Sequence, residues 1–205
     1  MNVGVLASGE GTNLQALLDT VHGREVRVVA VASDQPSARA LERARAAGVP
    51  TRVFLRSDYR DRAARDAAVA DWLQASGVEL VVLAGYMAIL DAAFVARFPD
   101  RIVNVHPSLL PAFPGVRAIE QALDYGVKVF GVTVHLVDEG VDTGPIILQR
   151  ALDAPDARDP VDLHERLRPI EHELLPRAIA LIATGRVRRD PGHPRRVLID
   201  GDGDV

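Results

Sequence analysis

Short continuous apolar runs alternate along the chain with longer segments in which apolar residues recur every three or four positions. Continuous runs are typical of buried strands, whereas the three-to-four spacing is typical of amphipathic helices. The runs predict strands at 3–7, 26–32, 52–55, 80–84, 102–105, 127–137 and 146–152. The spacing predicts helices at 14–21, 36–47, 58–76, 94–98, 118–125 and 161–184, the last one interrupted by Pro169 and Pro176.

This alternation predicts an α/β protein with a single doubly wound, mostly parallel sheet that carries helices on both faces. One antiparallel strand is expected near the C-terminal half. In open sheets of this kind ligands bind beyond the carboxyl ends of the strands. The polar residues that follow each predicted strand are therefore the candidates for function.

Composition narrows the class of protein. With 205 residues, 48% of them apolar, the chain has the size of one domain and enough material for a core. Its aromatic residues are five Phe, three Tyr and one Trp, so the core should be mainly aliphatic. A net charge of −4 argues against a general nucleic-acid binder. No apolar run approaches a membrane span and the first residues lack a charged signal segment, so we expect a cytoplasmic protein without nucleic-acid or membrane partners.

Cys is absent, and Lys occurs once, at Lys128, beside 23 Arg. The sequence therefore excludes disulfides, a thiolate nucleophile and Cys-ligated zinc. A P-loop needs Lys directly after its second Gly. Gly4 and Gly9 have the glycine spacing, but Glu10 follows them, which excludes the usual P-loop nucleotide hydrolases.

The first candidate site is the turn Ser8-Gly9-Glu10-Gly11-Thr12-Asn13, between a predicted strand and a predicted helix. Two glycines let backbone N–H groups approach an anion, and the helix N-terminus adds unpaired donors, so a phosphate is the natural ligand. One alternative is an ordinary tight turn capped by Thr12. Another is a dinucleotide site with Asp34 as the ribose-binding acid, although Leu14 replaces the third glycine of that motif.

The second candidate is the pair Asn104 and His106, two positions apart at the carboxyl end of a predicted strand and therefore on the same face. An amide donor beside a titratable imidazole can stabilise an oxyanion and transfer a proton. Alternatively, backbone groups satisfy both side chains.

An acidic run, Asp138-Glu139-Gly140-Val141-Asp142-Thr143-Gly144-Pro145, joins the last two predicted strands of the sheet. Its spacing does not match a calcium loop, and such runs are commonly solvated turns. A carboxylate here could also orient a histidine of another strand and favour its protonated form. His135 competes with His106 for that role, but its apolar neighbours indicate a buried structural histidine.

On the last predicted helix, Arg168 and Glu171 are three positions apart and share a face. They are either an exposed ion pair of small energetic value or a phosphate-binding Arg with a Glu for sugar hydroxyls.

Together these motifs resemble those of the phosphoribosylglycinamide formyltransferases, the folate-dependent enzymes of purine synthesis. The matching segments are SGEGTNLQALLD at 8–19, LAGYMAIL at 83–90, NVHPSLLPAFPG at 104–115, VDEGVDTGP at 137–145 and EH at 171–172. The resemblance runs from residue 1 to about 184. It implies the formyltransferase fold and transfer of formyl from the co-substrate 10-formyltetrahydrofolate to the amine of glycinamide ribonucleotide, without a metal or a covalent intermediate.

The resemblance also implies residue roles. His106 would be the general acid, Asn104 would hydrogen-bond the formyl oxygen, and Asp142 would favour protonated His106. The ribonucleotide would be bound by Gly11, Thr12, Asn13, Gly85, Pro107, Arg168 and Glu171. The folate would be bound by Arg62, Met87, Ala88, Ile89, Leu90, Val95, Ile102, Asn104, Val137, Asp138, Val141 and Asp142. The family commonly has Arg where this chain has Ala88, so affinity for the folate tail is expected to differ.

By the same resemblance, residues 1–185 would form the formyltransferase domain, with a phosphosugar-binding part at about 1–100 and a folate-binding and catalytic part at about 101–185. A charged tail, rich in Pro and Gly, would follow at 186–205. The resemblance suggests a cis Leu110–Pro111 bond. We expect a monomer or a homodimer.

Several alternatives stay open. A formyltetrahydrofolate hydrolase would share the motifs but usually carries an added regulatory domain. The methionyl-tRNA formyltransferases share the Asn-x-His segment and add a tRNA-binding domain for which this sequence has no room. From other classes, Asp34 would support an NAD(P)-dependent oxidoreductase, and the Gly-rich turn alone would suit a non-catalytic phosphosugar-binding protein.

Overall fold

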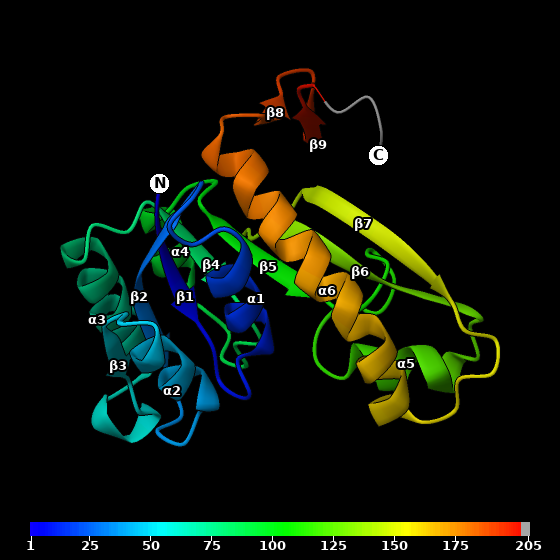
Figure 1. The fold of residues 1–205 in the computed structure, drawn as a ribbon, viewed down its shortest axis with the longest axis horizontal. Coiled ribbons are helices and arrows are strands. Elements are labelled where there is room, and N and C mark those ends of the chain that lie inside the picture. Colours follow the sequence, from blue (N-terminus) through cyan, green and yellow to red (C-terminus); the bar gives the residue numbers. More distant parts are fainter. Residues whose placement is uncertain (202–205) are drawn as a thin grey trace. The chain divides into compact units, whose positions relative to one another are not determined.

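The computed structural model describes residues 1–201 and contains a seven-stranded sheet with the strand order β3-β2-β1-β4-β5-β6-β7 (Figure 1). The pairs β3–β2, β2–β1, β1–β4 and β4–β5 are parallel, and β6–β7 is antiparallel. The predicted doubly wound, mostly parallel sheet with an antiparallel strand near the C-terminal half is therefore confirmed. The chain divides into two compact units, Met1–Asn104 and Val105–Val205, with the boundary inside β5.

The first unit holds the parallel strands and four α-helices. Its strands are β1 (Asn2–Leu6), β2 (Arg27–Ser33), β3 (Thr51–Val53), β4 (Leu80–Leu83) and most of β5 (Ile102–His106). Its helices are α1 (Thr12–Thr20), α2 (Arg39–Ala46), the 3-10 turn η1 (Arg56–Asp58), α3 (Arg62–Ala75) and α4 (Ala92–Arg97). Helix α1 packs with α2, and α3 packs with α4. This pairing fits right-handed crossovers, because the chain runs outward from β1 to β3 through α1 and α2 and then returns to β4 and β5 through α3 and α4. The buried side chains are mainly Val, Leu and Ala, as the composition predicts.

Helix α3 begins later than the apolar spacing predicts. Asp61 is its N-cap, and the Asp61 carboxylate accepts the N–H of Ala64 at 2.8 Å. Such a side-chain acceptor satisfies a donor that the first helical turn leaves unpaired. Of the residues that the spacing joined to this helix, Asp58 ends the separate turn η1, and residues 59–61 precede the helix.

The second unit contains α5 (Ala118–Tyr125), β6 (Val129–Leu136), β7 (Ile146–Asp153), α6 (Pro160–Ala183), β8 (Val187–Asp190) and β9 (His193–Ile199). Helix α6 packs on β6 and β7, and α5 packs on α6. Strands β8 and β9 form an antiparallel hairpin, and β9 packs against β7. The Leu110–Pro111 peptide bond is cis.

The predicted interruption of the last helix is wrong, because Pro169 and Pro176 both lie inside the continuous helix α6. Each proline removes one backbone hydrogen bond. The buried residues Leu163, Leu167 and Leu174 still recur at helical spacing and pack in the core, so burial of this face outweighs those losses.

The tail shows more order than its Pro and Gly content indicates. Its described part includes the β8–β9 hairpin, which turns at Pro191 and Gly192, whereas residues 202–205 lie outside the described residues. Within residues 1–201, no helix combines the length and the apolar character that crossing a membrane would demand.

Candidate active site

The acidic carboxylate of Asp142 lies between two histidines. Asp142 Oδ2 is 3.4 Å from His106 Nδ1, and Asp142 Oδ1 is 3.5 Å from His135 Nε2. Asp142 Oδ2 also accepts the backbone N–H of Gly115 at 2.7 Å. His106 closes β5 and Asp142 stands in the loop between β6 and β7. The structure thus brings His106 and Asp142 together, as the resemblance implies, and adds His135 to them.

The carboxylate of Asp142 is held in its ionised form. Burial alone would raise the pKa of Asp142, since it penalises the charged form. Hydrogen bonds from His135 and Gly115, together with the charges of His106 and His135, outweigh burial and lower the pKa of Asp142 to about 2. The site therefore contains a permanent negative charge beside two imidazoles at neutral pH.

Both ring nitrogens of His106 face oxygen acceptors. Nε2 lies 2.9 Å from the Phe113 carbonyl oxygen, and Nδ1 faces the Asp142 carboxylate. A carbonyl oxygen can only accept, so Nε2 carries a proton, and a second proton on Nδ1 would also find an acceptor. His135 is buried, and its Nδ1 bonds the Leu136 carbonyl oxygen at 2.8 Å.

Hydrogen bonds and close backbone contacts fix the conformation of the loop that contains Asp142. Asp138 Oδ1 accepts the Thr143 hydroxyl at 2.6 Å and the Gly140 N–H at 3.1 Å. Asp142 adopts a left-handed φ of 52°. A Cβ at Gly144 would lie 1.8 Å from the Leu136 carbonyl oxygen, so the position admits no side chain without a backbone shift. The interpretation as a merely solvated turn does not describe this loop.

The Gly-rich turn before α1 is braced by α2. Gly11, not Thr12, is the N-cap of α1, with a φ of 70°, and a Cβ there would lie 2.6 Å from the Ala40 Cα. The Gly9 carbonyl accepts the Ala40 N–H at 3.1 Å, and Glu10 pairs with Arg39 at 2.9 Å. These contacts fix the turn that leads into the first N–H groups of α1, the part of a helix that favours anions.

Asp34 has a structural partner in the first unit. The Ser8 hydroxyl donates to Asp34 Oδ1 at 2.6 Å and accepts the Met87 N–H at 2.9 Å. This chain of hydrogen bonds fixes the segment after β4 to the ends of β1 and β2. The hydrogen bond to Ser8 therefore accounts for an acidic residue at position 34 without a dinucleotide whose ribose it would bind.

On α6, Arg168 and Glu171 each have another neighbour. Arg168 bonds Glu165 at 2.7 Å, whereas Glu171 is buried and lies 3.7 Å from His164 Nε2. The hydrogen bond to Glu171 raises the pKa of His164. The two residues assigned to the ribonucleotide thus have different neighbours on the same helix.

The remaining predicted binding residues lie on helices, in strands and in loops. In the first unit, Met87 and Ile89 are 68% and 61% exposed, which is unusual for large apolar side chains. Gly85 and Arg62 are exposed, Thr12, Ala88, Leu90, Val95 and Asn104 are half-buried, and Asn13 and Ile102 are buried. In the second unit, Val141 is exposed, and Pro107, Val137 and Asp138 are half-buried.

A buried ion pair on α3 escaped the sequence analysis. Arg65 and Asp66 lie 2.7 Å apart, both buried, and Asp66 Oδ2 accepts the Asp91 N–H at 2.9 Å. Burial raises the pKa of Asp66 more than Arg65 lowers it. The signal was available, because Arg65 and Asp66 precede the buried Val69 and Ala70 by one helical turn. This pair anchors the end of the segment that contains Met87 and Ile89.

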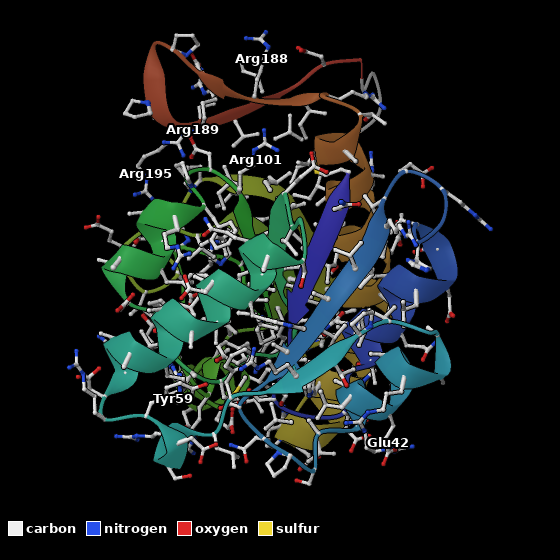
Figure 2. All side chains as sticks on the ribbon, turned by 90° about the vertical axis from the view of Figure 1, so that its left-hand side faces the viewer. Glu42, Tyr59, Arg101, Arg188, Arg189 and Arg195 are labelled. Carbon is white, nitrogen blue, oxygen red and sulfur yellow. The ribbon has the colours of Figure 1, made fainter. Side chains whose placement is uncertain are left out.

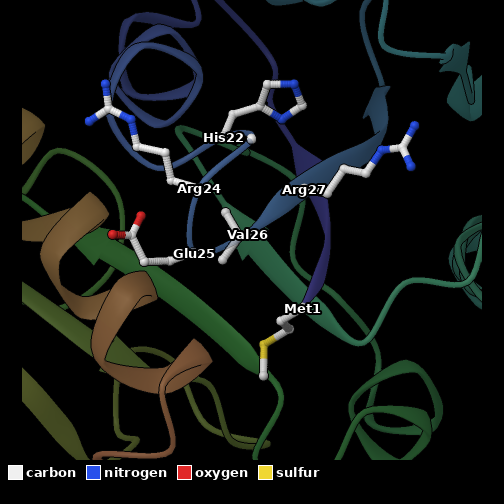
Figure 3. Close-up of a pocket in the computed structure, with 7 residues that line it drawn as sticks. Met1, His22, Arg24, Glu25, Val26 and Arg27 are labelled. Atoms are coloured by element: carbon white, nitrogen blue, oxygen red, sulfur yellow. The ribbon is translucent and has the colours of Figure 1, made fainter.

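A shallow hollow elsewhere in the first unit contains none of the predicted residues. It is lined by Met1 and residues 22–27, beside the amino ends of β1 and β2 (Figure 3). His22 Nδ1 accepts the Val28 N–H at 3.0 Å, which gives that histidine a structural role. Among residues 1–201, no group of three or more His, Asp or Glu side chains is arranged to hold a metal ion.

Comparison with known proteins defines the class. The model of the formyl transferase family matches residues 1–179. The chain therefore belongs to the formyl transferase family.

Individual relatives narrow the comparison. A phosphoribosylglycinamide formyltransferase of Mycobacterium tuberculosis is 48% identical over 181 residues, which cover 88% of this chain and 84% of that protein. The trifunctional purine biosynthetic protein adenosine-3 of Drosophila melanogaster is 44% identical over 193 residues, and the match covers 92% of this chain but only 14% of the fly protein. The crystal structure of glycinamide ribonucleotide transformylase 1 from Symbiobacterium toebii has 50% identity and a TM-score of 0.92, over 97% of this chain and 93% of that one.

Proposed function

We propose that this protein transfers the formyl group of 10-formyltetrahydrofolate to the amine of glycinamide ribonucleotide, in the cytoplasm, as a step of purine biosynthesis. The observation that carries the proposal is the contact of His106 with Asp142 at the end of β5, in a chain of the formyl transferase family. The names of the relatives above supply the acceptor and the group that is transferred, and the folate donor is what the resemblance of the sequence motifs implies.

The reaction is a direct transfer. The neutral amine of the ribonucleotide attacks the formyl carbon, and the carbonyl oxygen gains negative charge in the tetrahedral intermediate. His106 donates the proton of Nε2, which faces the Phe113 carbonyl before the substrates bind, to that oxygen as the general acid, and the amide of Asn104, on the same strand, donates a hydrogen bond to it. The bond between the formyl carbon and N10 of the folate then breaks, the proton lost by the amine passes to N10, and His106 takes its own proton back as the carbonyl re-forms. Asp142 balances the charge of His106 whenever the ring is protonated.

Binding of the ribonucleotide is assigned to seven residues. The turn of Gly11, Thr12 and Asn13 would hold the phosphate through backbone N–H groups at the start of α1. Glu171 would accept hydrogen bonds from the ribose hydroxyls, and Arg168 would leave Glu165 for the phosphate. Gly85 and Pro107 follow β4 and β5 and would contact the ligand with backbone.

Binding of the folate is assigned to apolar surface and one cation. The exposure of Met87, Ile89 and Val141 supports a flat apolar ligand such as a pterin. Ala88, Leu90, Val95 and Val137 would complete that surface, with the buried Ile102 behind it and with Asp138 and Asp142 facing the polar edge of the ring. Arg62, exposed at the first turn of α3, would pair with the acidic tail of the folate.

A spectroscopic deformylation assay tests the proposal. Transfer should require both substrates, and His106→Ala should lower kcat by about 10²–10⁴-fold, the usual contribution of a general acid. His193→Ala, at an exposed histidine of the hairpin, is the matched control and should retain wild-type activity. Deformylation without ribonucleotide would indicate a hydrolase instead, and binding of NADH without deformylation would indicate an oxidoreductase.

A further inference from the structure

The C-terminal hairpin lies beyond the segment that matches the family, yet it contacts the loop of Asp142. The family match ends at residue 179, whereas β8 and β9 span Val187–Asp190 and His193–Ile199. From β9, Arg195 Nη2 donates a hydrogen bond to the Thr143 carbonyl oxygen at 2.8 Å. Thr143 is the residue that follows Asp142.

Thr143 is held from two directions. Its hydroxyl donates to Asp138 inside the loop, and its carbonyl accepts from Arg195 outside it. Asp142 next to it has a left-handed φ of 52°, a conformation that is costly for a residue with a side chain and persists where surrounding contacts enforce it. A tether on the Thr143 carbonyl is such a contact, because it restricts rotation of the backbone that orients the Asp142 carboxylate.

The arginines of the hairpin have different partners. Arg188 is paired with Leu198 and Arg189 with Val197, and the register shifts directly after Arg189, so Arg195 and Arg196 lie in an irregular part of β9. Figure 2 labels Arg188 and Arg195 on opposite sides of this hairpin. Arg188 and Arg196 form ion pairs with Asp200 and Asp190, within the C-terminal segment. Arg195, in contrast, reaches the acidic loop.

We propose that Arg195 is a positioning residue for the formyl transfer, which it supports by holding the Thr143 carbonyl so that Asp142 stays against His106. The inference rests on the proposed function. Arg195 itself is exposed, and it contacts the loop at the backbone carbonyl of Thr143. It therefore acts through the loop and not on the reacting atoms.

Three variants and two measurements test this role. Arg195→Ala removes the donor, Arg195→Lys keeps a cationic donor, and Arg196→Ala removes the neighbouring arginine, which pairs with Asp190 instead. For Arg195→Ala we expect kcat/KM for 10-formyltetrahydrofolate to fall by about 3–10-fold, in keeping with one partly solvated, charge-assisted hydrogen bond. The KM for the ribonucleotide should stay within about twofold of wild type. Arg195→Lys should recover most of the loss, and Arg196→Ala should match wild type.

Hydrogen exchange of the loop gives a readout that does not depend on turnover. Amides of residues 138–144 should exchange faster in Arg195→Ala than in wild type or in Arg196→Ala. The inference is overturned if Arg195→Ala leaves loop exchange unchanged. It is also overturned if kcat/KM falls equally in Arg195→Ala and Arg196→Ala. The same holds if the loss of kcat/KM in Arg195→Ala parallels a loss of thermal stability and Arg195→Lys does not restore it. If the wild-type protein shows no formyl transfer, the proposed function is overturned instead. Hydrogen exchange of residues 138–144 would still test whether Arg195 restrains the loop.

Discussion

At the scale of single residues, the ionised carboxylate of Asp142 in the candidate active site also contributes to the stability of the folded protein. Its pKa of about 2 in the folded protein lies below the usual value of 3.8. The stability that this shift provides is fully present above about pH 4 and is lost as the pH falls toward 2, on the order of 2 kcal/mol in total.

This shift gives a pH-dependent prediction for Asp142→Asn, which removes the charge with little change of shape. The variant should be less stable than wild type near pH 6, and the difference should shrink by about 1 kcal/mol near pH 3, where the unfolded wild-type chain already binds the proton. Urea unfolding at both pH values measures it. An equal difference at pH 6 and pH 3 would mean that the charge of Asp142 does not stabilise the fold.

Arg62 and Arg60 provide a matched pair for the folate assignment. Both are exposed, but Arg60 already pairs with Asp61 at 3.1 Å, whereas Arg62 begins α3. Arg62→Ala should raise the KM for 10-formyltetrahydrofolate by about 2–5-fold, the range expected for one exposed ion pair. The KM for the ribonucleotide should not change, and Arg60→Ala should leave both constants unchanged. A rise in the ribonucleotide KM alone would remove Arg62 from the folate site.

At the scale of elements, α3 depends on its buried ion pair. Replacing Asp66 by Leu would leave Arg65 buried without its partner and would remove the acceptor of the Asp91 N–H. Loss of one member of a buried pair typically costs about 3–5 kcal/mol. Urea unfolding should show a loss of this size for Asp66→Leu.

Asp71 is the control on the same helix. Its side chain is 72% exposed and pairs with Arg97 at the surface, so Asp71→Ala should change the free energy of unfolding by no more than about 0.5 kcal/mol. Comparable losses in the two variants would show that burial of the Arg65–Asp66 pair does not matter.

The elements themselves were largely visible in the sequence, because each strand of the parallel sheet is a short apolar run and each helix has an apolar stripe. The predicted helix at 118–125 coincides with α5, and the strand run at 80–84 gives β4. The continuity of α6 through Pro169 and Pro176 was not visible. It depends on the packing of Leu163, Leu167 and Leu174, a tertiary effect that local rules for proline do not contain.

At the scale of the whole molecule, the site was predictable where topology or local spacing decides it. Asn104 and His106 share a face because they are two apart on one strand, and the strand rule places them at the end where ligands bind. The meeting of Asp142 with His106 came from resemblance, since 36 positions separate them in the sequence. The contact between Arg195 and Thr143 spans 52 positions, and no local pattern marks either partner.

The end of the family match has a practical consequence for anyone who produces this protein. A recombinant chain trimmed at residue 179 would stop inside α6, remove Leu181 from the buried face of that helix, and discard the hairpin with Arg195. Such a protein could still carry every motif by which the family is recognised. Its purified preparation would nonetheless lack the contact between Arg195 and the acidic loop, and the role proposed for Arg195 predicts lower rates for it than for the chain of 205 residues.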